Sequence, residues 1–163
     1  MIRDYNLNDL AIQREKAMSK TIVIHVVGCV LLLGGIVLMV RTGYVAVSLG
    51  VESPMPETSV TTPAAMEFWR QLTFIRMFAV AAIGFSAICF WAGSQLTSTQ
   101  QTSFLTLLVG LFATLGAMAV GQQVEIWNRG AGWALVGVLC TLLLACLAAV
   151  VYEGITSRRL ASA

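Results

Sequence analysis

Four apolar runs, each close to twenty residues long, dominate this sequence, and only one of them contains a charged side chain. The runs cover residues 21–40, 72–93, 104–124 and 131–152. An α-helix rises about 1.5 Å per residue, so each run can cross a hydrocarbon core of about 30 Å. Lipid offers no partner to backbone polar groups, so such runs fold as helices. The sequence therefore predicts an all-α membrane protein, a single domain over residues 1–163 with four transmembrane helices in an antiparallel bundle.

Charged residues are scarce and lie mostly outside these runs. They make up 11% of the chain, whereas a soluble domain carries about 25%. The net charge of +2 is too small to indicate a nucleic-acid partner. We expect other integral membrane subunits and lipids as partners instead.

The basic residues predict the orientation, because four spans place both termini on one side. The terminal side carries six of them: Arg3, Arg14, Lys16, Lys20, Arg158 and Arg159. The opposite side carries three: Arg41, Arg70 and Arg129. Basic residues accumulate in cytoplasmic segments. We therefore expect cytoplasmic termini in a plasma membrane, of the bacterial inner type.

Two segments outside the spans have patterns of their own. The N-terminal arm, residues 1–20, contains an amphipathic helix over 6–20 that either continues into the first span or bends at Ser19. This helix is either a solvated cytoplasmic element or an arm that docks on a neighbouring subunit. A longer extracytoplasmic loop covers residues 41–71, and the alternation of valine and leucine over 44–51 predicts a short half-buried strand. The strand packs either on the chain's own helix ends or on a partner.

Arg76 is the charged residue inside a span. If residues 94–103 form the turn between the second and third helices, Arg76 lies level with Gln122 and one helical turn from Glu125. An arginine side chain can reach either of them. We interpret the three residues as a structural clamp between helices near the outer interface. The alternative is that they line a polar cavity for a substrate or a proton.

Small residues recur at helical spacing on both of these helices. They are Ala79, Ala82, Ser86 and Gly93 on the second span, and Gly110, Ala113, Thr114, Ala117 and Gly121 on the third. Such faces let helices approach closely in lipid. The two faces either pack on each other within a tight hairpin or pack against neighbouring chains.

His25 is the only histidine of the chain. It could ligate a haem or chlorophyll metal, but a bis-histidine haem site needs a second ligand that the chain lacks. The four cysteines all lie inside spans, with no CxxC motif and no metal-ligand spacing. We therefore predict no catalytic residue, no metal site and no cofactor apart from bound lipids.

The stretch EFWRQLTFIRMFAVAAIGFSAI resembles the small DoxX-like membrane proteins. The shared features are Arg76 near the outer end of the second helix, Ala79 and Gly84 after it, and a third helix that contains Gly110, Gly116 and Gly121. The resemblance covers about residues 20–155. It implies a four-helix fold and an accessory role beside a larger oxidoreductase.

Three functional hypotheses follow from the sequence. The first is a non-catalytic accessory or structural subunit of a larger membrane complex, with contacts through its helices, its N-terminal arm and the loop over 41–67. The second is a small transporter or lipid-handling protein with a polar cavity around Arg76, Gln122 and Glu125. The third is a pigment- or haem-associated helper that uses His25.

Overall fold

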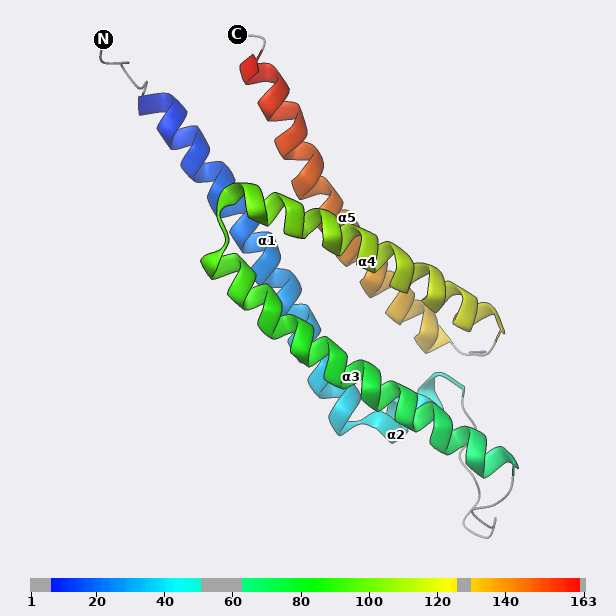
Figure 1. Ribbon diagram of the computed structural model, residues 1–163. Coiled ribbons are helices and arrows are strands. Elements are labelled where there is room, and N and C mark those ends of the chain that lie inside the picture. Colours follow the sequence, from blue (N-terminus) through cyan, green and yellow to red (C-terminus); the bar gives the residue numbers. More distant parts are fainter. Residues whose placement is uncertain (1–6, 51–62, 126–129, 162–163) are drawn as a thin grey trace.

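The computed structural model describes residues 7–50, 63–125 and 130–161, and every secondary-structure element in these ranges is a helix. The helices are α1 (Leu7–Val40), α2 (Thr42–Ser48), α3 (Pro63–Gln95), α4 (Ser98–Glu125) and α5 (Gly130–Ala161) (Figure 1). Four of them contain segments long and apolar enough to cross a membrane, namely Met18–Val40, Ala65–Gln95, Ser98–Glu125 and Gly130–Ile155. The prediction of an all-helical chain with four candidate spans is confirmed.

The long helices extend beyond the predicted spans. α1 is one continuous helix from Leu7 to Val40, so the N-terminal arm runs into the first span and is not separated from it at Ser19. α3 begins at Pro63, because proline lacks only an N–H that the first helical turn leaves unpaired in any case. α5 continues to Ala161. The ends of α1 and α5 that carry the chain termini project in the same direction, past the α3–α4 turn (Figure 1).

The connection between α3 and α4 is much shorter than the turn predicted over 94–103. α4 begins at Ser98 because Thr97 and Gln100 form a capping box. The backbone N–H of Thr97 donates to Gln100 Oε1 at 3.0 Å, and the Thr97 hydroxyl donates to the same oxygen at 2.9 Å. The backbone N–H of Gln101 donates to Thr97 O at 2.8 Å and closes the first turn of α4.

The strand predicted over 44–51 is wrong for the described residues, which form helix α2 up to Ser48. The Thr42 hydroxyl donates to Leu38 O at 2.7 Å, so the chain stays helical around the end of α1. Ala46 and Leu49, three residues apart, are both buried against Leu72 and Ile75 of α3. A helix satisfies its own backbone groups, whereas a strand needs a neighbouring strand that this segment lacks among the described residues.

Gly50 ends this short segment. Its φ of 101° lies in the left-handed region, and its amide donates to Val47 O at 3.1 Å. Glycine adopts that conformation without steric cost. Through Ala46 and Leu49, the described residues that follow α1 pack on the chain's own helix α3.

The long helices associate in two pairs, α1 with α3 and α4 with α5 (Figure 1). Glycines bring α1 and α3 together: Gly28 lies against Cys89 and Phe90, and Gly35 lies against Ala79 and Ile83. A Cβ atom at position 35 would stand 2.7 Å from Ile83 Cγ1 and 2.9 Å from Ala79 O. The α1–α3 contact thus depends on the absence of a side chain at Gly35.

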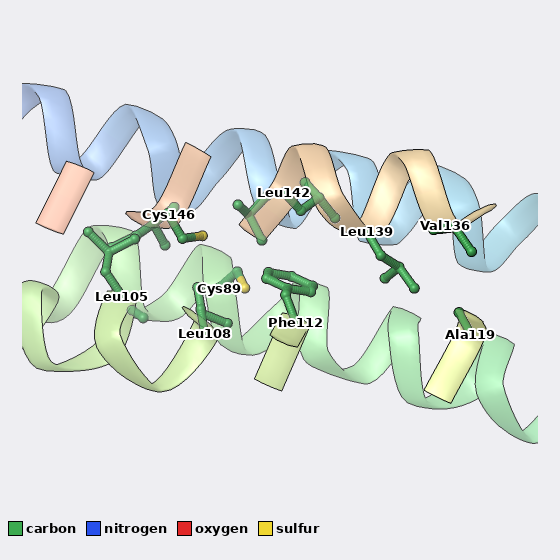
Figure 2. Close-up of a cluster of buried hydrophobic side chains, with 12 residues drawn as sticks. Cys89, Leu105, Leu108, Phe112, Ala119, Val136, Leu139, Leu142 and Cys146 are labelled. Atoms are coloured by element: carbon green, nitrogen blue, oxygen red, sulfur yellow. The ribbon is translucent and has the colours of Figure 1, made fainter. Parts of the chain in front are cut away.

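The main apolar core lies where the two pairs meet. Phe112 of α4 is fully buried, with Leu139 and Leu142 of α5 on one side and Cys89 of α3 nearby (Figure 2). Ile24 and Val27 of α1 belong to the same cluster. The core therefore contains residues of all four long helices.

Candidate functional site

Lys20 of α1 is a lysine with an almost completely buried side chain, which has only 4% of its surface exposed. Its ammonium forms an ion pair with Glu153 of α5, with 2.6 Å between Nζ and Oε1. It also donates to the hydroxyls of Ser98, at 2.8 Å, and Thr102, at 3.0 Å, both on α4. The backbone oxygen of Ser98 lies 3.0 Å away. Four oxygen atoms of α4 and α5 thus surround one nitrogen atom of α1.

The local structure of α4 accounts for three of these oxygens. The capping box at Thr97 fixes the start of α4, which places Ser98 in its first turn and Thr102 one turn further on the same face. The Thr102 hydroxyl donates to Glu153 Oε2, so its lone pairs are available to Lys20. Glu153 accepts from Thr102 with one carboxylate oxygen and from Lys20 with the other.

The arrangement determines the chemical role of Lys20. An ammonium group has three hydrogen atoms and no lone pair, and here four oxygens accept from it. The contacts of the Lys20 nitrogen are therefore those of a hydrogen-bond donor and ion-pair partner. Removal of one member of a buried ion pair leaves an uncompensated charge. Loss of one member of this pair should therefore destabilise the folded protein.

A second group of polar residues continues the cluster toward the apolar core. Gln101 of α4 is buried, and its Nε2 donates to Thr21 Oγ1 at 3.1 Å and to Gly93 O at 3.2 Å. The Nδ1 atom of His25 lies 2.7 Å from Thr21 O, to which it donates because a carbonyl can only accept. These bonds connect α1, α3 and α4 at one level.

The His25 ring occupies space that Gly93 provides. A Cβ atom at position 93 would overlap Cε1 of this ring and stand 2.7 Å from its Nδ1. The ring also lies near Phe90, with 5.9 Å between the centroids. The described residues hold no group of three or more histidine, cysteine or acidic side chains arranged to bind a metal. Ligation of a haem or chlorophyll by His25 stays a prediction.

Arg76, Gln122 and Glu125 are not joined in the structure. Arg76 is exposed on α3, and Glu125 is exposed at the end of α4. Within residues 7–50, 63–125 and 130–161, no hydrogen bond or ion pair connects Arg76 with Gln122 or Glu125. α3 packs mainly on α1, not on α4, which is the physical reason. The clamp, and the cavity that was its alternative, stay predictions.

The two faces of small residues also differ from the expected hairpin packing. Ala79, Ala82, Ser86 and Gly93 of α3 are buried. Their neighbours include Gly35 and His25 of α1. On α4 every member of the face is exposed: Gly110, Ala113, Thr114, Ala117 and Gly121. In the structure the two faces do not pack on each other, because α1 occupies the face of α3.

Two of the four cysteines are buried, and three of the tryptophans are exposed. Cys89 and Cys146 belong to the buried core, whereas Cys29 and Cys140 are exposed, and all four are free thiols. Trp69, Trp91 and Trp133 are exposed. Trp127 lies outside the described residues.

The sequence analysis missed the Lys20–Glu153 pair, although a signal was present. The predicted first span begins at residue 21 and the predicted fourth span ends at 152, so Lys20 and Glu153 flank two spans at equal depth. The T-x-x-Q capping box at Thr97 was a second signal, because it positions Ser98 and Thr102.

No protein-family model, no curated protein and no solved structure matches the chain.

Proposed function

We propose that the chain is a non-catalytic accessory subunit of a larger integral membrane protein complex. The observation that carries this proposal is the small-residue face of α4, namely Gly110, Ala113, Thr114, Ala117 and Gly121, all exposed. In lipid, helices associate through small residues that permit close approach of their backbones. The comparable face of α3 is used inside the chain, whereas that of α4 is available to a helix of another subunit.

The distribution of polar groups supports a structural role. The hydrogen bonds of the Lys20 ammonium join α1 to α4 and α5. The cluster therefore serves to hold α1, α4 and α5 together. We infer that its contribution is to position the helices and that substrate chemistry belongs to other subunits.

The membrane position follows from the same cluster. Lys20 and the end of α1 at Val40 are separated by about 30 Å at 1.5 Å per residue, which equals the thickness of the hydrocarbon core. We place the four helices as an antiparallel bundle with the Lys20–Glu153 pair at one interface and Arg41 and Arg76 near the other. Both chain termini then lie on the Lys20 side, in the cytoplasm of a bacterium with this protein in its inner membrane.

The proposal includes the resemblance to DoxX-like proteins. This resemblance implies a partnership with an oxidoreductase. It rests on the residues around Arg76 and on the glycines of α4. The helical arm of α1 before Met18 projects beyond the α3–α4 turn (Figure 1) and provides a second place for contact with a partner.

Native mass after extraction in a mild detergent tests the proposal. We expect a complex of fixed stoichiometry that contains other membrane chains. Gly110→Leu and Gly121→Leu should release the protein from this complex without unfolding it, because no atom lies within 4 Å of a Cβ at either position.

Gly84→Leu is the matched control, since Gly84 of α3 is equally open and lies on another helix. It should leave the complex intact. A wild-type protein that migrates as a monomer would overturn the proposal. Retention of the complex by both α4 variants would exclude the α4 face as the contact.

A further inference from the structure

We propose that α4 and α5 form a binding site for a small monovalent cation, and that the Lys20 ammonium fills this site as a cation tethered to α1. The proposal does not depend on the accessory role. It follows from the four oxygens around Nζ, which are the two Ser98 oxygens, Thr102 Oγ1 and Glu153 Oε1.

The types of donor are those that bind hard cations. A backbone carbonyl, two hydroxyls and one carboxylate are oxygen ligands, and none of the four comes from α1. In potassium channels, rings of backbone carbonyl oxygens replace the hydration shell of the ion. If Lys20 were withdrawn, the oxygens of α4 and α5 would remain as a preformed set.

The distances select the class of cation. The four oxygens lie 2.6–3.0 Å from Nζ, whereas calcium is bound at about 2.3–2.6 Å and magnesium at about 2.0–2.1 Å. One carboxylate in the set balances one positive charge. The site is thus sized for an ammonium group, and its single carboxylate favours a monovalent cation of similar size, such as methylammonium or an alkali cation, over a divalent metal.

Glu153 supplies the charge that makes the site attractive to a cation. Ser98 and Thr102 belong to the first turns of α4, where the helix dipole is positive and repels cations. The Glu153 carboxylate offsets this repulsion and is 31% exposed, so it also faces the route by which an ion could enter. Without this carboxylate the remaining oxygens should not hold a cation.

The proposal explains how α1 is attached to the α4–α5 pair. The ammonium on its flexible stem is a compact point charge, and it attaches α1 at Lys20 to the site that a free ion would occupy. If the contact were only an ion pair, a positive charge attached at position 20 would be needed. If the oxygens form a cation site, a free cation of ammonium size can replace the Lys20 side chain, and this replacement can be measured.

Chemical rescue of Lys20→Ala tests the proposal in the full-length protein in detergent. The unfolding midpoint is measured in choline chloride, and then with choline replaced by methylammonium or potassium at constant ionic strength. We expect a lowered midpoint in choline and a saturable recovery with methylammonium or potassium, because only these fit between the oxygens. The wild-type midpoint should not respond, since Lys20 fills the site.

Two further variants complete the experiment. Lys20→Ala combined with Glu153→Gln should show no response to either cation. If Lys20→Ala does not fold in choline, folded protein should be recovered by extraction in methylammonium or potassium. The proposal is overturned if both cations leave the midpoint of Lys20→Ala at its choline value, or if neither recovers folded protein. It is also overturned if the double variant responds as strongly as Lys20→Ala.

Discussion

Small residues follow α3 and α4 at the same helical spacing, but the two helices bury them differently. The face of α3 with Ala79 and Ala82 lies against α1, whereas the face of α4 with Gly110 and Gly121 is exposed. Both faces satisfy the sequence criterion for close packing in lipid. The difference teaches that such a pattern reports the ability to pack and does not identify the partner. The following predictions test whether the two faces really differ in this way.

The largest effect is expected at Gly35, where α1 meets the small face of α3. Gly35→Ala would place a Cβ 2.7 Å from Ile83 Cγ1 and 2.9 Å from the backbone oxygen of Ala79. A backbone atom cannot move aside alone, so the helices must separate. We expect a loss near the upper end of the range of about 1–3 kcal/mol for overpacking, measured by denaturant unfolding in detergent micelles.

Two open glycines serve as controls for this variant. A Cβ at Gly34, the preceding residue, meets nothing within 4 Å, and the same is true of Gly110 on α4. Alanine at either position should stabilise the isolated chain by about 0.5–1 kcal/mol, because glycine is unfavourable inside a helix. Equal effects of Gly35→Ala and Gly110→Ala would remove the distinction between the two faces.

A smaller loss is expected at Gly93, where the face of α3 reaches the polar cluster. Gly93→Ala would place a Cβ against Cε1 of His25 and 2.7 Å from its Nδ1, and this side chain is held by its bond to Thr21 O. The ring can turn only if it gives up this bond, so we expect a cost of about 1–2 kcal/mol from strain and the lost hydrogen bond. The double variant with His25→Ala should recover most of the loss. No recovery would show that the ring is not the obstacle.

The contrast between the two faces also explains which features the sequence could predict. Length and composition were sufficient for four spans, because a helix in lipid must be apolar and about 20 residues long. The pairing of helices was not predictable in this way. Ala79 and Gly93 would fit a neighbour on either side, and only the three-dimensional contacts show that Gly35 and His25 of α1 occupy that place.

The polar cluster and helix α2 show two different reasons why a feature of the structure was not predicted from the sequence. From the sequence, Lys20 indicates only topology, because a lysine at a span end ordinarily faces water. Its burial depends on the oxygens of Ser98 and Thr102, which are distant in sequence. In the segment after Val40, valines at alternate positions suggested a strand, but the local bonds of Thr42 and the contacts of Ala46 with α3 favour a helix.

The smallest effect is expected at Arg76, and it decides which helix lies beside α3. A clamp with Glu125 requires α3 and α4 to be neighbours at this level, whereas the structure leaves both side chains exposed. Substitution of an exposed residue away from special contacts changes stability by about 0.5 kcal/mol or less. We therefore expect small losses for Arg76→Gln and for Glu125→Gln. We also expect the double variant to equal their sum within about 0.5 kcal/mol.

A double-mutant cycle in the same unfolding assay measures this additivity. The Glu67–Arg70 pair, exposed and joined at 2.8 Å, provides the scale, because surface pairs of this kind contribute about 0–1 kcal/mol. A coupling between Arg76 and Glu125 well above that of Glu67 and Arg70 would mean that the clamp exists. α3 would then have to approach α4 in the folded protein, and the small-residue face of α3 could not pack on α1 alone.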